Sequence, residues 1–198
     1  MSEDKKKKPF YKKWWVWLIA IIVIAAASSG GGGGGSSSYD PSESSIPLPD
    51  SQLEFLKVVQ KAQNEANAAQ NEMKLGVALK GRTQDLPNVL PSLSVTDWIG
   101  TITRLDTADN GKGVLSVSIG DDISVETWNN GLSDTGDKTL LDGELLNKVA
   151  DYTRRDKVKF SGEFFKDGET YIKEQSMTTS GGTKEPEFLF KFTSVDKI

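Results

Sequence analysis

The sequence predicts a mainly β domain that follows a single N-terminal apolar helix and a glycine-rich linker. The chain of 198 residues opens with a lysine-rich segment and an apolar run, and six consecutive glycines follow shortly after. From Trp98 onward, apolar and polar residues alternate with the period of two that is typical of half-buried strands. Turn signals rich in Gly, Asn and Asp separate these alternating stretches. We therefore expect a five- to six-stranded barrel with one helix between strands 3 and 4.

Residues 1–13 contain six lysines, and the run from Trp14 to Ala27 is apolar. Lysines resist translocation and tryptophans favour the headgroup region, which predicts a cytoplasmic basic segment at 1–13 and a single-pass transmembrane anchor at 14–30. The apolar run is shorter than the roughly 20 residues that span a bilayer, and the small residues before Ser28 also fit a cleaved signal peptide. The C-terminal domain is expected outside the cell in both cases, either held at the cell membrane or secreted.

Residues 31–50 are rich in Gly, Ser and Pro and poor in apolar side chains, so we expect a disordered linker. Residues 51–82 are predicted to hold a stalk helix that packs on the barrel or precedes it. Over residues 51–75, Leu53, Leu56 and Val59 lie on one helical stripe, and Gly76 is the predicted end of the helix. The stripe can pack on the chain's own barrel or pair with a partner.

The predicted strands, in chain order, cover residues 98–104, 114–119, 123–128, 157–165, 171–177 and 188–195. A short helix is predicted for residues 140–152, and Asn110-Gly111 marks a hairpin turn between the first two strands. Three strands, a helix and then two or three strands is the order of an OB-fold, a small Greek-key barrel. Residues 96–198 are therefore predicted to form an OB-fold-like domain.

The composition excludes several classes of function. The chain has no Cys and no His, so a Cys/His zinc site, a thiol nucleophile, a Ser-His-Asp triad and a lipidated cysteine are all impossible. The net charge is −4, and residues 96–198 carry 13 basic against 19 acidic residues. An acidic surface repels phosphate backbones, which disfavours a nucleic-acid ligand. No metal and no cofactor is expected.

Several short motifs lie within residues 52–195: Asp97-Trp98-Ile99-Gly100, Gly111-Lys112-Gly113, Thr127-Trp128-Asn129-Asn130, Phe160-Ser161-Gly162-Glu163-Phe164 and Glu185-Pro186-Glu187-Phe188. Together with the preceding helix and Arg82, this set resembles an uncharacterised group of bacterial exported or membrane-anchored OB-fold-like domains, the tRNA-anti-like domains. The N-terminus resembles membrane anchors common in Gram-positive bacteria. The resemblance implies a fold and a bacterial envelope setting, and it implies no activity and no binding residue.

The cluster of Thr127, Trp128, Asn129 and Asn130 is the first candidate for a ligand face. It follows the third strand, where the binding face of an OB barrel lies. A tryptophan beside amides can stack on a sugar or a base and bond its edge. A core tryptophan followed by a turn is the alternative interpretation.

The basic residues Arg154, Arg155 and Lys157, with Lys159, form a second candidate, a contact for an anionic polymer. A solvated corner between a helix and a strand explains the same pattern.

Two acidic clusters are weaker candidates. Asp106 and Asp109 lie near a turn as in a calcium loop, but their spacing is that of a hairpin. Asp121-Asp122 and Glu126 could act as paired catalytic carboxylates, but solvated strand ends explain them better, because surface carboxylates are the norm.

These observations predict a membrane-tethered, extracytoplasmic binding module without enzymatic activity. Its expected ligand is an unknown envelope protein or a glycan. The alternative function is an exported OB domain that binds single-stranded nucleic acid, and a third is a hydrolase that uses carboxylates alone.

Overall fold

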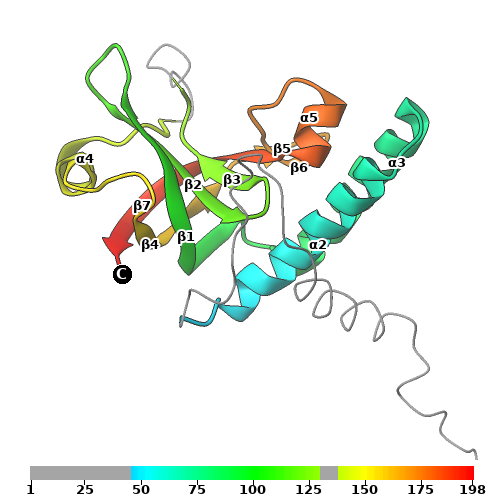
Figure 1. Cartoon of the computed structure of the whole chain (residues 1–198), viewed down its shortest axis with the longest axis horizontal. Helices are drawn as coiled ribbons and strands as arrows, with labels where there is room; N and C mark the ends of the chain where they lie inside the picture. The colour runs from blue at the N-terminus through cyan, green and yellow to red at the C-terminus, as the bar shows by residue number, and fades with distance from the viewer. Residues whose placement is uncertain (1–45, 130–137) are drawn as a thin grey trace, which may run out of the picture. The chain divides into compact units, whose positions relative to one another are not determined.

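The computed structural model describes residues 46–129 and 138–198 (Figure 1). The predicted segments 1–13 and 14–30 and nearly all of the predicted linker 31–50 lie outside this part of the chain. Among the helices of the described part, none is long and apolar enough to span a membrane.

The described chain contains four helices and seven strands. The helices are α2 (Asp50–Asn67), α3 (Glu72–Val89), α4 (Gly143–Ala150) and α5 (Thr179–Lys184). The strands are β1 (Ser94–Thr107), β2 (Gly113–Gly120), β3 (Ile123–Glu126), β4 (Lys157–Phe164), β5 (Lys166–Asp167), β6 (Tyr171–Ile172) and β7 (Glu187–Lys197).

Five strands close into a barrel in the order β1–β2–β3–β7–β4. The long strand β1 closes it by pairing antiparallel with β2 through one part of its length and with β4 through another. The pair β3–β7 is parallel, and the remaining pairs are antiparallel. The five-stranded, mainly β architecture is confirmed, as is the helix between the third and fourth barrel strands, which is α4.

The predicted strand at residues 171–177 is largely wrong. Only Tyr171 and Ile172 form a strand, and it pairs with β5 in a separate two-stranded sheet. The residues that follow β6 still run along the start of β7, because the Leu189 N–H donates to the Lys173 carbonyl at 2.9 Å and the Gln175 N–H donates to the Glu187 carbonyl at 2.9 Å.

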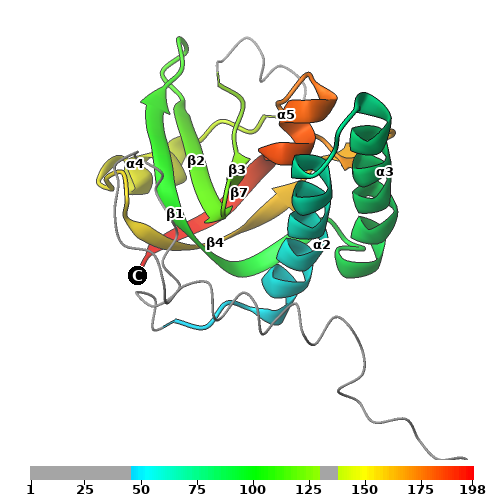
Figure 2. The ribbon, with the colours of Figure 1, turned by 45° about the vertical axis from the view of Figure 1, so that its right-hand side comes forward.

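Helices cover two sides of the barrel. Both views place α2 and α3 beside each other on one side, with α5 next to them, and α4 on the opposite side (Figures 1 and 2). On the α2 side, Phe55 forms the centre of an aromatic cluster with Trp98, Phe164 and Phe188, at ring-centroid distances of 5.1, 5.4 and 5.3 Å. Because Phe55 is fully buried in the main core, α2 is an integral part of the barrel's hydrophobic interior.

A buried polar contact also holds α2 on β1. The Gln52 side chain accepts from the Ile99 N–H at 2.8 Å and donates to the Ile99 carbonyl at 2.6 Å. These two backbone groups would otherwise be buried without partners, so Gln52 acts as a substitute strand partner at this point of β1. Ser51, one residue away, accepts from the Trp98 indole N–H at 3.0 Å.

The helical region differs from the prediction in three ways. The expected continuous helix over 51–75 is divided, because α2 ends at Asn67 and α3 begins after Asn71, whose side chain caps it by accepting from the Lys74 N–H at 2.9 Å. Gly76 lies inside α3 rather than at a helix end. On α2, Leu53 is exposed and Phe55 faces the core in its place.

Candidate functional sites

Trp128 lies directly after β3 and is half-buried. Its backbone N–H donates to the Thr139 hydroxyl at 2.8 Å, which fixes the position of the residue. The Lys173 Nζ lies 5.2 Å from the centroid of the indole ring, within the range of a cation–π contact. The indole Nε1 is buried and has no hydrogen-bond partner, which is uncommon for a tryptophan and leaves one donor unused.

The neighbours of Trp128 have different surroundings. Thr127 is fully buried, and its hydroxyl accepts from the Leu115 N–H at 3.1 Å and donates to the Trp128 carbonyl at 3.1 Å. Its side chain is therefore part of the barrel wall rather than of an exposed face. Asn129 is exposed, and Asn130 lies outside the described residues.

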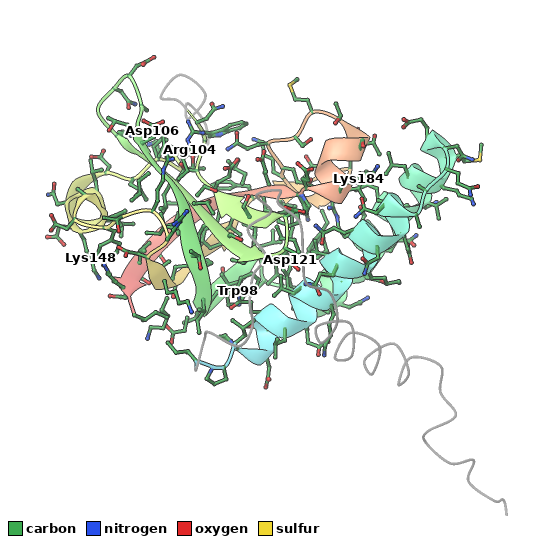
Figure 3. The ribbon with its side chains drawn as sticks, viewed as in Figure 1. Trp98, Arg104, Asp106, Asp121, Lys148 and Lys184 are labelled. Carbon is green, nitrogen blue, oxygen red and sulfur yellow. The ribbon has the colours of Figure 1, made fainter. Side chains whose placement is uncertain are left out.

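Glu126 occupies the outer face of the barrel just before Trp128. It pairs with Ser116 of β2, which pairs in turn with Arg104 of β1, so the three side chains share one face of the sheet (Figure 3 labels Arg104). Only 8% of Glu126 is exposed. Burial, together with the nearby charge of Glu187, raises the pKa of Glu126 to about 7, while the Ser116 hydroxyl and Arg104 oppose this shift.

We call this row of Arg104, Ser116, Glu126 and Trp128, together with Lys173, the β3 face. It combines an aromatic ring, one unused donor, a hydroxyl and groups of both charges. The indole ring of this surface can stack on a ligand, and the Glu126 carboxyl, with a pKa near 7, both donates and accepts at neutral pH. The indole Nε1 and the Ser116 hydroxyl are buried, so they support the face from behind. The sequence indicated Trp128, but the contact with Lys173 requires a register that the sequence does not reveal.

The basic residues lie at the start of β4. Arg154 and Arg155 are exposed and Lys157 is half-buried. Arg155 has a positive φ of 76°, and its N–H donates to the Ile102 carbonyl at 2.8 Å, which anchors the turn to β1. Beside it, Asp156 forms an ion pair with Lys197 at 2.8 Å.

The weaker acidic candidates have separate positions. Asp121 is exposed in the turn between β2 and β3, where its carbonyl accepts from the Gln63 side chain of α2 at 3.1 Å. Asp106 is exposed near the β1–β2 hairpin, within 3.4 Å of Arg104 (Figure 3). In the described ranges 46–129 and 138–198, no three acidic side chains gather as ligands for a metal ion.

A second site, which the sequence did not indicate, surrounds a buried ion pair between α3 and the segment after β6. Arg82 contacts the Glu174 carboxylate, and it also donates to the Gly182 carbonyl of α5 at 2.6 Å. The side chain of Arg82 is fully buried and that of Glu174 is 7% exposed. Desolvation raises the pKa of Glu174 to about 7, and the attraction of Arg82 offsets only part of this shift.

Glu174 also lines a cleft of about 360 Å³, which we call the Glu174 cleft. The walls come from α3, the β5–β6 hairpin and α5. Its lining includes Leu79, Asp167, Glu169, Glu174, Met177 and Gly182. The sequence holds one signal for this site: Arg82 follows Leu75 and Ala78 on the buried stripe of α3, where a charged residue requires a partner.

No family model matches the chain, and no match was found among the curated proteins or the solved structures. Function is therefore inferred from the β3 face and from the Glu174 cleft.

Proposed function

We propose that the barrel is an OB-fold-like binding module without catalytic activity, held outside a bacterial cell by the N-terminal segment. A closed five-stranded barrel with a parallel β3–β7 pair and a helix between β3 and β4 supports the OB-fold assignment. The lysine-rich start and the apolar run at 14–30 support the membrane tether. The sequence has no Cys and no His, which excludes thiol and imidazole catalysis and leaves carboxylate chemistry as the enzymatic alternative.

Trp128 carries the assignment of the ligand face. It is half-buried at the end of β3, it contacts Lys173, and its indole donor is unused. An aromatic ring held against Lys173 and two positions after the Glu126 carboxyl suits a polyhydroxyl ligand, because sugar C–H groups stack on a ring while hydroxyls bond nearby polar groups. We therefore propose a cell-envelope glycan as the ligand of the β3 face.

The β3 face carries charges of both signs, because Arg104 and Lys173 accompany Glu126, rather than the uniformly positive groove that suits a nucleic acid. Glu126 lies on this face, and the first residue of the adjacent strand β7, Glu187, contributes a further carboxylate. Carboxylates repel a phosphate backbone, whereas they accept hydrogen bonds from sugar hydroxyls. An OB-fold that binds single strands would need a positively charged groove on this face.

The test is calorimetric titration of the full-length chain with soluble peptidoglycan glycan strands and, separately, with a single-stranded oligonucleotide at low salt. Saturable binding of the glycan is expected, with at least about tenfold weakening by Trp128→Ala, since stacking contributes about 1–3 kcal/mol per ring. Trp128→Phe keeps a ring and should retain most of the affinity.

The matched control is the double variant Arg154→Ala/Arg155→Ala at the basic corner, which should bind the glycan unchanged. Loss of binding in this control and not in Trp128→Ala would move the site to the corner. Binding of the oligonucleotide alone would replace the glycan proposal by the nucleic-acid alternative. Binding of neither ligand would overturn the glycan proposal.

A further inference from the structure

The Glu174 cleft contains a buried carboxylate with one unused oxygen. Oε1 of Glu174 contacts Arg82, while Oε2 has no hydrogen-bond partner although 93% of the side chain is buried. Arg82 is committed to Glu174 Oε1 and to the Gly182 carbonyl, so its own contacts leave Oε2 free. A desolvated carboxylate oxygen of this kind is a strong acceptor for a charged donor.

The local charge favours a cation in the cleft. Asp167 and Glu169 line the same cleft as Glu174. The balancing guanidinium of Arg82 is fully buried behind the wall, and the Nζ of Lys173 lies against the Trp128 ring. Three carboxylates therefore line the cleft against one cationic side chain, Lys173, whose Nζ lies against the Trp128 ring.

The rest of the cleft fits a short carbon chain. Leu79 contributes an aliphatic surface from α3, and Met177 is 100% exposed at the rim. An unbranched thioether adapts its shape to flexible apolar ligands. Gly182 keeps the carboxylate accessible, because a Cβ at this position would lie 2.7 Å from Glu174 Oε2.

From this arrangement we propose that the Glu174 cleft binds a primary alkylammonium group, with its nitrogen on Glu174 Oε2 and its methylenes against Leu79 and Met177. The same chemistry is presented by a lysine side chain of a partner protein and by a free diamine. The cleft shares Lys173 with the β3 face, but the argument for an alkylammonium ligand does not depend on the glycan proposal.

The experiment is a titration of the ¹⁵N-labelled full-length chain with butylammonium, followed by its amide NMR spectrum, with 1-butanol as the neutral probe of the same chain length. Saturable shifts at Leu79, Glu174 and Gly182 are expected with butylammonium and not with 1-butanol. Glu174→Gln should weaken binding about tenfold or more, because it removes a charge-assisted bond. The double variant Arg154→Ala/Arg155→Ala, at the exposed basic corner before β4, should leave the titration unchanged.

Glu174→Gln also removes the partner of buried Arg82, so a second variant protects the test against misfolding. Glu169→Lys, at an exposed position of the cleft, should weaken binding by about threefold, and Glu163→Lys makes the same charge change at an exposed position on β4. Equal weakening by both lysine variants, equal shifts with 1-butanol, or no saturable shift would overturn the proposal.

The source of the ammonium group is resolved by two further probes. Nα-acetyl-lysine N-methylamide represents a lysine in a protein, and 1,4-diaminobutane represents a free diamine. Tighter binding of the first supports a protein partner at the cleft, and tighter binding of the second supports a soluble diamine ligand.

Discussion

Replacing Glu126 by Gln should stabilise the protein at alkaline pH and have little effect in acid. Glu126 is 8% exposed, and its pKa is raised from 4.5 to about 7, mainly by burial. The folded state therefore holds this proton more tightly than the unfolded state does. The contribution of Glu126 to stability is fully present below about pH 4.5 and is lost as the pH rises through about 7.

The magnitude follows from the shift. A difference of about 2.5 pKa units corresponds to about 3 kcal/mol at pH 8.5, and to less than about 1 kcal/mol at pH 5. A glutamine has nearly the same shape, stays neutral, and can still bond the Ser116 hydroxyl. Glu126→Gln should therefore raise the free energy of unfolding at pH 8.5 by up to about 3 kcal/mol, and by much less at pH 5.

The assay is urea unfolding of the full-length chain in a mild detergent at both pH values, followed by near-ultraviolet circular dichroism. Comparing the variant with the parent at each pH cancels the titration of groups that do not interact with Glu126. Glu163→Gln, at an exposed position on β4, is the control and should change stability by less than about 0.5 kcal/mol at both pH values. A difference between Glu126→Gln and the parent that is the same at pH 5 and pH 8.5 would refute the reasoning.

Three further substitutions test the contacts of the helices with the barrel, each by urea unfolding. Phe55→Ala removes the ring that contacts Trp98, Phe164 and Phe188, and it should destabilise the fold by about 3–5 kcal/mol; a loss below 1 kcal/mol would mean that α2 is not part of the core. Gln52→Ala leaves the Ile99 N–H and carbonyl without partners and should lower stability by about 2 kcal/mol or more. Its control is Lys57→Ala on the same helix, which removes only an exposed ion pair with Glu54 and should change stability by less than about 0.5 kcal/mol. Arg82→Met leaves Glu174 buried and unpaired and should lower stability by about 3–5 kcal/mol. The double variant Arg82→Met/Glu174→Leu should recover most of this loss. A double variant as unstable as the single one would show that the ion pair itself stabilises the fold.

The barrel strands were predictable because their pattern is local. Alternating residues and strong turn signals such as Asn110-Gly111 indicate strands without any knowledge of their partners. The strand expected at 171–177 failed because its residues bond to β7 only in part, and their placement is decided by the Arg82–Glu174 contact rather than by their own periodicity.

The helices that the sequence missed have weak local signals. α3 contains Gly76, Gly81 and Pro87, and its buried stripe includes the charged Arg82. The helical spacing of its apolar residues is therefore difficult to recognise in the sequence. α5 contains two glycines, Gly181 and Gly182, and two threonines in its six positions, all of low helix propensity. It forms because Thr178 caps it and tertiary contacts hold it. In both cases tertiary contacts override local preference.

The two candidate sites also differ in how much of each could be predicted from the sequence. Trp128 was identifiable from its place after a predicted strand, whereas its neighbour Lys173 is 45 positions further along the chain and reaches it only through the barrel register. The Glu174 cleft joins α3 to a segment about 90 residues away, and only the isolated charge of Arg82 on an apolar stripe pointed toward it.

The closure of the barrel by β1 limits how this protein can recognise others. Because β1 pairs with β2 along one part and with β4 along another, the five barrel strands form a closed ring of paired neighbours. A partner therefore cannot extend this sheet by adding a strand, which is a common route both to peptide recognition and to aggregation. For the binding function that we propose, selectivity at the barrel must come from side chains, so substitutions on the β3 face would change ligand preference while the backbone stays unchanged.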